Sequence, residues 1–195
     1  MNWAGDLAQT HIEPNDHVLD LGCGIMHATL DFIPTYPKTR IQCGNLVGVD
    51  IYEPYLKFLE DRSIKTVKWD LTNVPYPFED KSFDVILLYD ILEHIPTLEE
   101  VESILRESER IARKKILILT PNKFKKNEES VENVYEMGRN PLQRHQLLIK
   151  RSFLRKNGYN VHLCFKGVVY NFAFKNLTSR IAQTPIPTLK EESHN

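Results

Sequence analysis

Asp90, Glu93 and His94 occur together in the segment YDILEHIP, and a further histidine, His145, follows later in the chain. Carboxylates and imidazoles can take a proton from a hydroxyl or amine, and they do so best when the pKa of the base lies near the ambient pH. The same oxygen and nitrogen atoms could instead hold a divalent cation such as Mg²⁺, which would acidify a bound hydroxyl. We therefore take Asp90, Glu93, His94 and His145 as the candidate catalytic residues. The structural alternative is that His94 orients the turn before Pro96 and that no metal binds.

A second group of residues, in HVLDLGCGIM, could form a ligand-binding loop. Gly22 and Gly24 follow an apolar run, where glycine lets the backbone approach a ligand. Asp20 lies inside that run, and a buried carboxylate is costly unless it has a partner or a task. A dinucleotide would bring an anionic pyrophosphate, whereas S-adenosylmethionine brings an ammonium and a sulfonium. No Lys or Arg occurs from Asp20 to Pro37, and a nicotinamide cofactor would want a third glycine at His27, so the loop favours the cationic ligand.

Two more acidic residues stand at the ends of predicted strands. Asp50, in LVGVDIY, is placed to accept hydrogen bonds from both ribose hydroxyls of an adenosine. Asp70, in VKWDLTNV, could accept from the adenine amino group, and Leu71 beside it offers backbone polar groups and an apolar wall. The structural alternative is that strand-end aspartates cap the helices that follow them.

The elements that must position these residues alternate between strand and helix patterns. This alternation indicates an α/β fold, in which helices cover both faces of a mostly parallel sheet. The predicted strands are His17 to Gly22, Leu46 to Ile51, Ile64 to Asp70, Phe83 to Asp90, Lys115 to Thr120 and Tyr159 to Phe165. Most of them are apolar throughout, as strands buried on both faces must be.

The clearest helix covers residues 97–113, because Thr97 and Glu100 form a capping box before an amphipathic run. Further helices are predicted after Asp50 and over residues 143–158. The chain then continues as two strands joined by a tight turn at Lys166 and Gly167, which predicts an antiparallel end to the sheet.

Length and composition predict one domain. The chain has 195 residues with 42% hydrophobic content, enough for a single core over residues 1–182, while residues 183–195 read as a disordered tail. The polar segment from Lys123 to Gln143 is the expected lid or substrate loop. A formal net charge of −1 gives no indication of nucleic acid. Three scattered cysteines, no leader and no membrane span lead us to expect a cytoplasmic protein.

The motifs VLDLGCG, VGVDIY, the aspartate of VKWD, SFDVILLYDILEHI and ILILTPN, in this order, resemble the class I S-adenosylmethionine-dependent methyltransferases. The run NPLQRHQLLIKRSFLRKNGYNV is similar to small stand-alone members of that superfamily. The resemblance implies a Rossmann-like, doubly wound sheet of seven strands with an antiparallel last strand. It also implies the ligand contacts: the methionine end of the cofactor at Asp20, Gly22, Cys23 and Gly24, the ribose at Asp50 with Ile51 beside it, and the adenine at Asp70 and Leu71.

Other residues of the site follow by weaker arguments. Tyr89 could face the sulfonium through a cation–π contact, although strand-end aromatic residues also pack simply in cores. Asp90, Glu93, His94 and His145 resemble the metal ligands of RNA-ribose and ubiquinone-pathway O-methyltransferases, which keeps Mg²⁺ as an alternative cofactor.

The sequence therefore predicts a methyltransferase that uses S-adenosylmethionine, with an unidentified oxygen or nitrogen acceptor. Met26 stands where the family often has a third glycine. It leaves open a catalytically silent protein that binds S-adenosylmethionine or serves as a scaffold. Because little chain precedes the first strand to enclose a small acceptor, the acceptor is expected to be large or to be held by a partner subunit.

Overall fold

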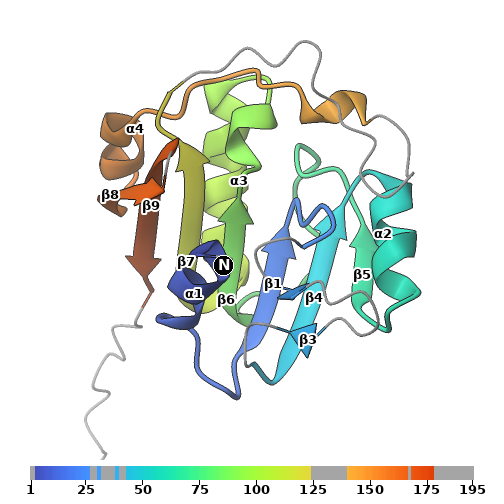
Figure 1. Cartoon of the computed structure of the whole chain (residues 1–195). Helices are drawn as coiled ribbons and strands as arrows, with labels where there is room; N and C mark the ends of the chain where they lie inside the picture. The colour runs from blue at the N-terminus through green and yellow to red at the C-terminus, as the bar shows by residue number, and fades with distance from the viewer. Residues whose placement is uncertain are drawn as a thin grey trace, which may run out of the picture.

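The computed structural model describes residues 3–26, 30–31, 38–39, 43–123, 140–166 and 168–177. Its main sheet has seven strands in the order β5-β4-β1-β6-β7-β9-β8 (Figure 1). These strands are β1 (His17–Leu21), β4 (Asn45–Asp50), β5 (Lys65–Lys68), β6 (Phe83–Tyr89), β7 (Ala112–Pro121), β8 (Asn160–Lys166) and β9 (Val168–Asn176). A short pair, β2 (Leu30–Asp31) with β3 (Lys38–Thr39), stands apart from it. The predicted α/β class is confirmed.

The direction of the strands also agrees with the prediction. Strands β5, β4, β1, β6 and β7 pair in parallel, and β9 runs antiparallel to both β7 and β8. The last strand in sequence is therefore inserted beside β7, which leaves β8 at the edge of the sheet. Lys166 pairs with Val168 across this hairpin, while Gly167 lies outside the described residues.

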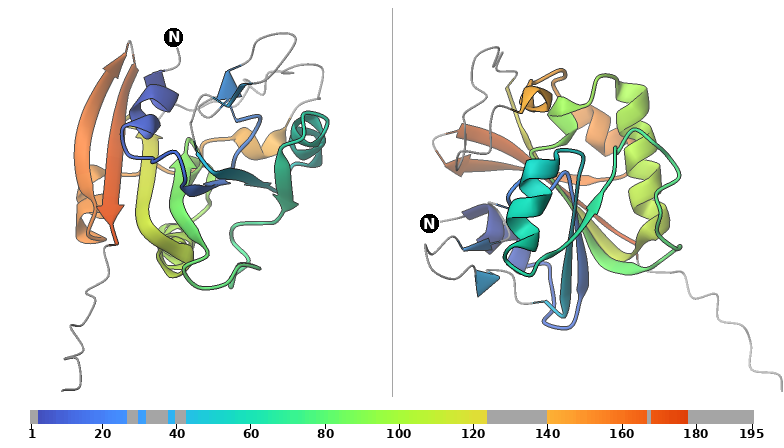
Figure 2. Two further views of the ribbon diagram at one scale, coloured as in Figure 1. Left: turned by 90° about the horizontal axis from the view of Figure 1, so that it is seen from below. Right: turned by 90° about the vertical axis from the view of Figure 1, so that its right-hand side faces the viewer.

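Helices cover the sheet on both sides (Figure 2). On one face, Leu19, Leu21, Ile86 and Leu88 pack in a core with α3 (Leu98–Ile111) and the short helix η1 (Leu92–His94). On the other face, α1 (Trp3–Gln9) and α2 (Glu53–Glu60) cover a second core that includes Val18 and Val85. Both faces are buried because the central strands are apolar at successive positions. None of the described helices is long and apolar enough to cross a membrane.

Helix α3 begins at the predicted capping box. The Thr97 hydroxyl accepts the Glu100 backbone N–H at 3.2 Å, and the Glu100 carboxylate accepts the Thr97 N–H at 3.0 Å. This satisfies two of the backbone donors that a helix start leaves without partners. The helix therefore presents a fixed face to β6 and β7.

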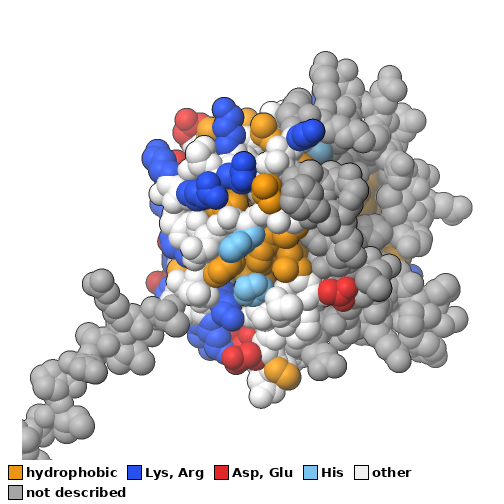
Figure 3. All heavy atoms as spheres, turned by 60° about the vertical axis from the view of Figure 1, so that its left-hand side comes forward, with side chains coloured by type: hydrophobic (Ala, Val, Ile, Leu, Met, Phe, Trp, Pro, Cys, Tyr) orange, Lys and Arg blue, Asp and Glu red, His pale blue; other side chains and the backbone are white. Residues whose placement is uncertain are grey.

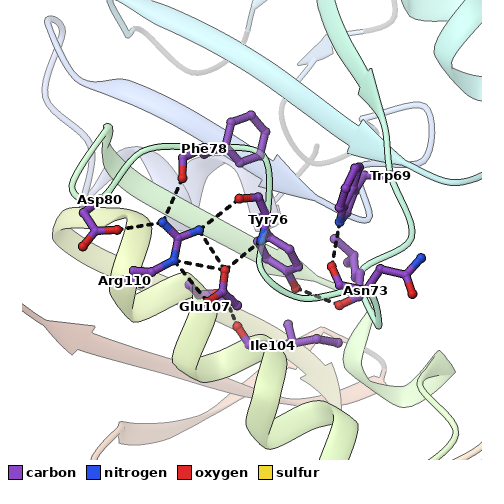
Figure 4. Close-up of polar contacts among 10 residues, drawn as sticks. Trp69, Asn73, Tyr76, Phe78, Asp80, Ile104, Glu107 and Arg110 are labelled. Atoms are coloured by element: carbon purple, nitrogen blue, oxygen red, sulfur yellow. Dashed lines mark hydrogen bonds and ion pairs between the residues drawn. The ribbon is translucent and has the colours of Figure 1, made fainter.

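A loop between β5 and β6 is held on α3 by Arg110 (Figure 4). The Arg110 guanidinium donates to the carbonyl oxygens of Tyr76 (3.1 Å) and Phe78 (2.8 Å) and to Asp80 (2.7 Å). Glu107 holds Arg110 from the same helix at 2.8 Å and accepts the Tyr76 N–H at 2.8 Å. One charge pair thus fixes the loop that follows Asp70 and Leu71.

The helix predicted over residues 143–158 is wrong in its first half. The chain forms the short helix η3 (Pro141–Gln143), an irregular segment over residues 144–150 that we call the strap, and α4 (Arg151–Lys156). The backbone N–H groups of Gln146 and Leu147 donate to the Glu93 carbonyl at 2.7 and 3.1 Å. They are therefore not available for the i to i−4 hydrogen bonds of an α-helix. The Asn171 amide holds the carbonyl of Ile149, whose side chain is fully buried. Tertiary contacts have overridden a helix-forming sequence.

Candidate active site

A cavity of about 230 Å³ opens at the carboxyl ends of β1, β4 and β6, where open α/β sheets place their ligands. The predicted site residues that line it are Asp20, Gly22, Cys23, Gly24, Asp50, Ile51, Tyr89, Asp90 and His94. Three carboxylates thus border the cavity, and no Lys or Arg is among the described residues that line it. The cavity is suited to a cation and unsuited to a pyrophosphate.

The loop after β1 depends on glycine at two positions. Gly22 and Gly24 have φ angles of 68° and 52°, a region that L side chains avoid. A Cβ at Gly22 would lie 2.3 Å from the Ile91 side chain, whereas a Cβ at Gly24 would meet nothing within 4 Å. Gly22 therefore permits close packing against η1, and Gly24 leaves room over the cavity.

Met26 also adopts the left-handed region, with φ 59°. Its side chain is 1% exposed and extends toward β4, where a Cβ at Gly48 would lie 2.6 Å from the Met26 methyl. The backbone at this position thus has the conformation that a glycine would take most easily. The methionine side chain is buried in the core beneath the loop, and Met26 is also one of the residues that line the cavity.

Asp50 ties the loop to the end of β4. Its carboxylate accepts the Gly24 N–H at 2.9 Å and the Tyr52 N–H at 2.8 Å. Burial raises the pKa of Asp50, while these N–H groups act in the opposite direction. Each oxygen keeps a further lone pair, so the carboxylate can still accept a hydroxyl from a ligand.

Asp20 and Tyr89 form the base of the cavity. Asp20 is 3% exposed, and Tyr89, 7% exposed, has a buried hydroxyl with no hydrogen-bond partner among the described residues. Burial first, and then the charges of Asp20 and Asp90, raise the pKa of Tyr89 far above its ordinary value, so the phenol stays neutral. A buried hydroxyl without a partner is rare in a folded protein and is a reason to expect a ligand beside it.

Asp90 and Glu93 form a carboxyl pair at the end of β6. Asp90 is exposed to the cavity with φ 51°, an unfavourable backbone for a non-glycine residue that is typical of functional sites. Burial and the charge of Asp90 raise the pKa of Glu93 well above its ordinary value, and the Thr120 hydroxyl donates to Glu93 at 3.1 Å. Burial raises the pKa of Asp90 to about 6, while its hydrogen bond with Glu93 lowers it. These shifts favour the shared proton on the inner carboxyl, Glu93, over the outer one, Asp90.

His94 and His145 stand beside this pair, with ring centroids 5.0 Å apart. Burial lowers the pKa of His94 to about 4, so its imidazole is neutral, and its Nδ1 lies 3.2 Å from the Arg144 carbonyl. Ligand atoms of Glu93, His94 and His145 all lie within 4.8 Å of one another. Asp90 is not part of that group, so the structure brings together three of the four residues of the predicted metal set.

Asp70 and Leu71 lie outside the residues that line the cavity. The Asp70 carboxylate accepts the N–H of Thr72 at 2.9 Å and its hydroxyl at 2.8 Å, which is a local turn contact. The next element after β5 is the strand β6, so Asp70 does not cap a helix. The Leu71 side chain is buried in the core, and its carbonyl accepts the Tyr76 hydroxyl at 3.0 Å. Their contact with adenine stays a prediction.

The helix η3 contributes a wall of the cavity from the end of the expected lid or substrate loop, although the sequence analysis singled out none of its residues. Asn140, Leu142 and Gln143 line the cavity, and the Gln143 amide donates to the Tyr55 hydroxyl of α2 at 2.8 Å. Asn140, whose side chain accepts the Leu142 N–H, precedes Pro141 at the start of η3. This Asn-Pro pair was the signal for a helix start. The predicted lid from Lys123 otherwise falls mostly outside the described residues.

The fold and the site together define an open α/β protein whose cavity, at the carboxyl ends of the strands, favours a positively charged ligand. The sequence profile of the family described as "Methyltransferase domain" matches residues 19–119. The chain belongs to this family, and the predicted membership of the class I methyltransferases is confirmed.

Known proteins agree with this assignment. Demethylmenaquinone methyltransferase from Symbiobacterium thermophilum is 30% identical over 115 residues, which are 53% of this chain and 44% of that protein. The enzyme of the same name from Lactiplantibacillus plantarum is 28% identical over 115 residues, which are 54% of this chain and 47% of that protein. The matches thus span less than half the length of these relatives.

Solved structures share the fold. The YcgJ protein from Bacillus subtilis superposes with a TM-score of 0.62 at 13% identity, over 92% of this chain and 100% of that one. Magnesium protoporphyrin IX methyltransferase from Synechocystis PCC 6803, solved with bound SAM, gives a TM-score of 0.56 at 16% identity, over 91% of this chain and 76% of that one. The predicted seven-stranded Rossmann-like fold is therefore confirmed.

Proposed function

We propose that this protein binds S-adenosylmethionine in the cavity and transfers its methyl group to an oxygen or nitrogen atom of an acceptor. The observation that carries the proposal is the charge of the cavity. Asp20, Asp50 and Asp90 border it, His94 is neutral, and no Lys or Arg is among its described lining residues. When bound, the cofactor supplies an electrophilic methyl group on a sulfonium.

The chain's own residues then have separate tasks. Asp20 and the Gly22–Gly24 backbone would hold the methionine end, and Asp50 would accept the ribose hydroxyls. Asp90, which faces the cavity and ionises near neutral pH, would take the proton from the acceptor. Glu93 would keep its own proton and hold Asp90 in place by their hydrogen bond. Little else is needed, because a direct displacement depends mainly on alignment in a dry site.

Calorimetry with S-adenosylmethionine, S-adenosylhomocysteine and NAD tests this proposal. We expect both sulfur compounds to bind and NAD not to bind. Asp50→Ala, which leaves two backbone N–H groups without their acceptor, should abolish binding, whereas Asp61→Ala at the exposed end of α2 should leave it unchanged. Binding of NAD in place of S-adenosylmethionine would refute the cofactor. Binding without turnover on any acceptor would support the silent alternative.

A second candidate, metal-assisted O-methyl transfer, is favoured by one observation. Glu93, His94 and His145 offer one carboxylate and two imidazoles whose ligand atoms lie within 4.8 Å of one another. The His94 Nδ1 lies 3.2 Å from the Arg144 carbonyl, so its Nε2 would be the nitrogen left for a metal, an arrangement common in metal-binding histidines. Mg²⁺ or a similar ion held there would acidify an acceptor hydroxyl.

Titration with Mg²⁺, Mn²⁺ and Zn²⁺, followed by calorimetry and by the melting temperature, decides between the two candidates. Metal-assisted transfer requires binding that His145→Ala removes. His17→Ala is the matched control, because this exposed histidine begins β1 at the opposite end of the sheet. A site for none of the three ions would reject this candidate and leave the Asp90 proposal intact.

We also propose that the protein works in the cytoplasm. The three cysteines are all free, as expected in a reducing compartment. Fractionation of the native host would test this.

A further inference from the structure

A net charge near zero conceals a strong separation of charge along the chain. Between Gly138 and Lys190 there are ten of the 25 Lys and Arg residues and none of the 26 Asp and Glu residues. Such asymmetry indicates a charged partner more directly than the overall balance does. The described part of this stretch begins with η3, whose residues line the cavity, and continues through the strap to α4.

Five cations of this stretch form what we call the basic track: Arg144, Lys150, Arg151, Arg155 and Lys156. Arg144 follows η3, whose residues line the cavity, and the other four lie at the start of α4 and along it. The strap runs over the carboxyl ends of the strands from η3 to α4 at the edge of the sheet (Figure 1). An extended segment of seven residues spans at most about 25 Å, so the strap limits how far α4 can lie from η3.

The fold does not use these charges. None of the five forms an ion pair with any described residue, whereas Lys68, Arg110, Arg113, Lys114 and Lys175 all do so elsewhere. Arg151 and Arg155 are four residues apart on a short helix, where like charges are destabilising. Except for the half-buried Arg151, the track is exposed, and the strap is fixed from below by Glu93 and Asn171. Four of the five charges are therefore exposed to solvent, and none is paired with a described carboxylate.

The surroundings of the track suit a chain of nucleotides. Figure 3 shows this side of the molecule, with Lys and Arg side chains gathered above a group of apolar and histidine side chains. On the other face of the sheet from α4, beyond the edge strand β8, the exposed His162 ring lies parallel to Phe174, with an interplanar angle of 2° and centroids 5.8 Å apart. Proteins that bind single strands commonly combine cations that follow the backbone with aromatic rings on which bases stack. A membrane surface would call for exposed apolar residues among the cations, and Leu142 is the one large apolar side chain of η3, the strap and α4 that is exposed.

We propose that the basic track binds the phosphodiester backbone of a single-stranded nucleic acid and so brings one of its nucleotides to the cavity as methyl acceptor. The methyl transfer rests on the proposed function, whereas the binding does not. The acceptor gives up a proton from its oxygen or nitrogen to Asp90 as that atom takes the methyl group, and the sulfonium leaves as a neutral thioether.

Fluorescence anisotropy with labelled 12-mer RNA and DNA strands tests the binding without any cofactor. We expect affinity that falls with KCl concentration, and a triple variant Lys150→Gln, Arg155→Gln, Lys156→Gln that binds more weakly. For single strands, log K changes by about 0.7 log units per phosphate contact for each tenfold change in salt. Three phosphate contacts therefore contribute about 2 log units of affinity at 0.1 M salt relative to 1 M. Losing them corresponds to about a hundredfold loss of affinity at 0.1 M salt and to a flatter salt dependence. The control triple Lys57→Gln, Lys65→Gln, Arg106→Gln removes the same charge from exposed positions elsewhere and should stay near the wild type.

Three results would overturn the proposal: no binding of either strand, equal losses in the two triple variants, or tight binding to vesicles containing anionic phosphatidylserine with none to nucleic acid. Calorimetry of the track variant with S-adenosylmethionine should give unchanged affinity, because the variant leaves the cavity residues intact. If the wild type binds nucleic acid but not S-adenosylmethionine, the proposed function fails and the binding surface remains. Transfer of radiolabelled methyl groups to the strand that binds would support both.

Discussion

Arg110 gives the sharpest test of how the loop after β5 is held. Replacing it by Met keeps most of the apolar stem but removes the guanidinium that reaches Tyr76, Phe78 and Asp80 (Figure 4). Glu107, whose side chain is 14% exposed, would then keep its charge with only the Tyr76 N–H beside it. A hydrogen bond to a charged group contributes about 1.5–3 kcal/mol to the free energy of unfolding. The ion pair with the exposed Asp80 adds little to this. We expect Arg110→Met to lower the free energy of unfolding by about 3 kcal/mol.

Urea unfolding followed by circular dichroism measures this loss, and an unchanged m-value would show that the unfolded state is not the cause. Arg106→Met is the matched control, because Arg106 lies one turn earlier on α3, is 68% exposed and meets Glu102 only at 4.0 Å. It should cost less than about 0.5 kcal/mol. The double variant Glu107→Leu, Arg110→Met should recover part of the loss, since no buried charge is left alone. If Arg110→Met costs no more than Arg106→Met, the Glu107–Arg110 pair does not hold the loop.

Three further predictions follow from the backbone and the charges. Gly22→Ala should destabilise the protein by about 2 kcal/mol more than Gly24→Ala in thermal unfolding, because only at Gly22 would the new Cβ meet another side chain; equal losses would contradict this. Met26→Gly should lower the free energy of unfolding in urea by about 1–3 kcal/mol, because the lost core burial outweighs the relief of a positive φ. The affinity for S-adenosylmethionine should change by no more than about twofold. Much tighter binding would mean that the side chain obstructs the cavity. The hydrogen bond from Arg110 lowers the pKa of Glu107 below 4.5, so the stability that the pair contributes is present above that pH and is lost as the pH falls through the folded pKa. The difference in unfolding free energy between wild type and Glu107→Gln should therefore shrink below about pH 4.5. A constant difference would show that the pair is not coupled to folding.

The positions of strands and helix starts could be predicted from the sequence where one physical requirement applies to neighbouring residues. Strands buried on both faces need continuous apolar runs, so the runs before Asp20, Asp50 and Asp90 were found within a residue or two of their ends. The Thr97 capping box fixed the start of α3. These are local rules, and the local sequence is enough to apply them.

Local rules failed where distant contacts decide the conformation. The strap has the composition of a helix, yet its N–H groups bond to Glu93 and its Ile149 is buried under β9. At the strap the deciding partners are set by the packed fold, which no short window of sequence contains. Asp70 differs, because it lies two residues beyond β5 and its carboxylate serves the turn at Thr72, two residues away.

Charge illustrates the same point at the scale of the whole molecule. The overall balance of −1 gave no reason to expect a polyanion, because it averages two regions that the fold keeps apart. Carboxylates lie inside the cavity, and the basic track lies outside on the segment that follows its η3 wall. Water and salt screen the exposed cations of the track within about a Debye length of 10 Å, so these cations weaken the negative field of the cavity only slightly. A cationic cofactor and an anionic acceptor could then approach one mouth without competing for the same residues.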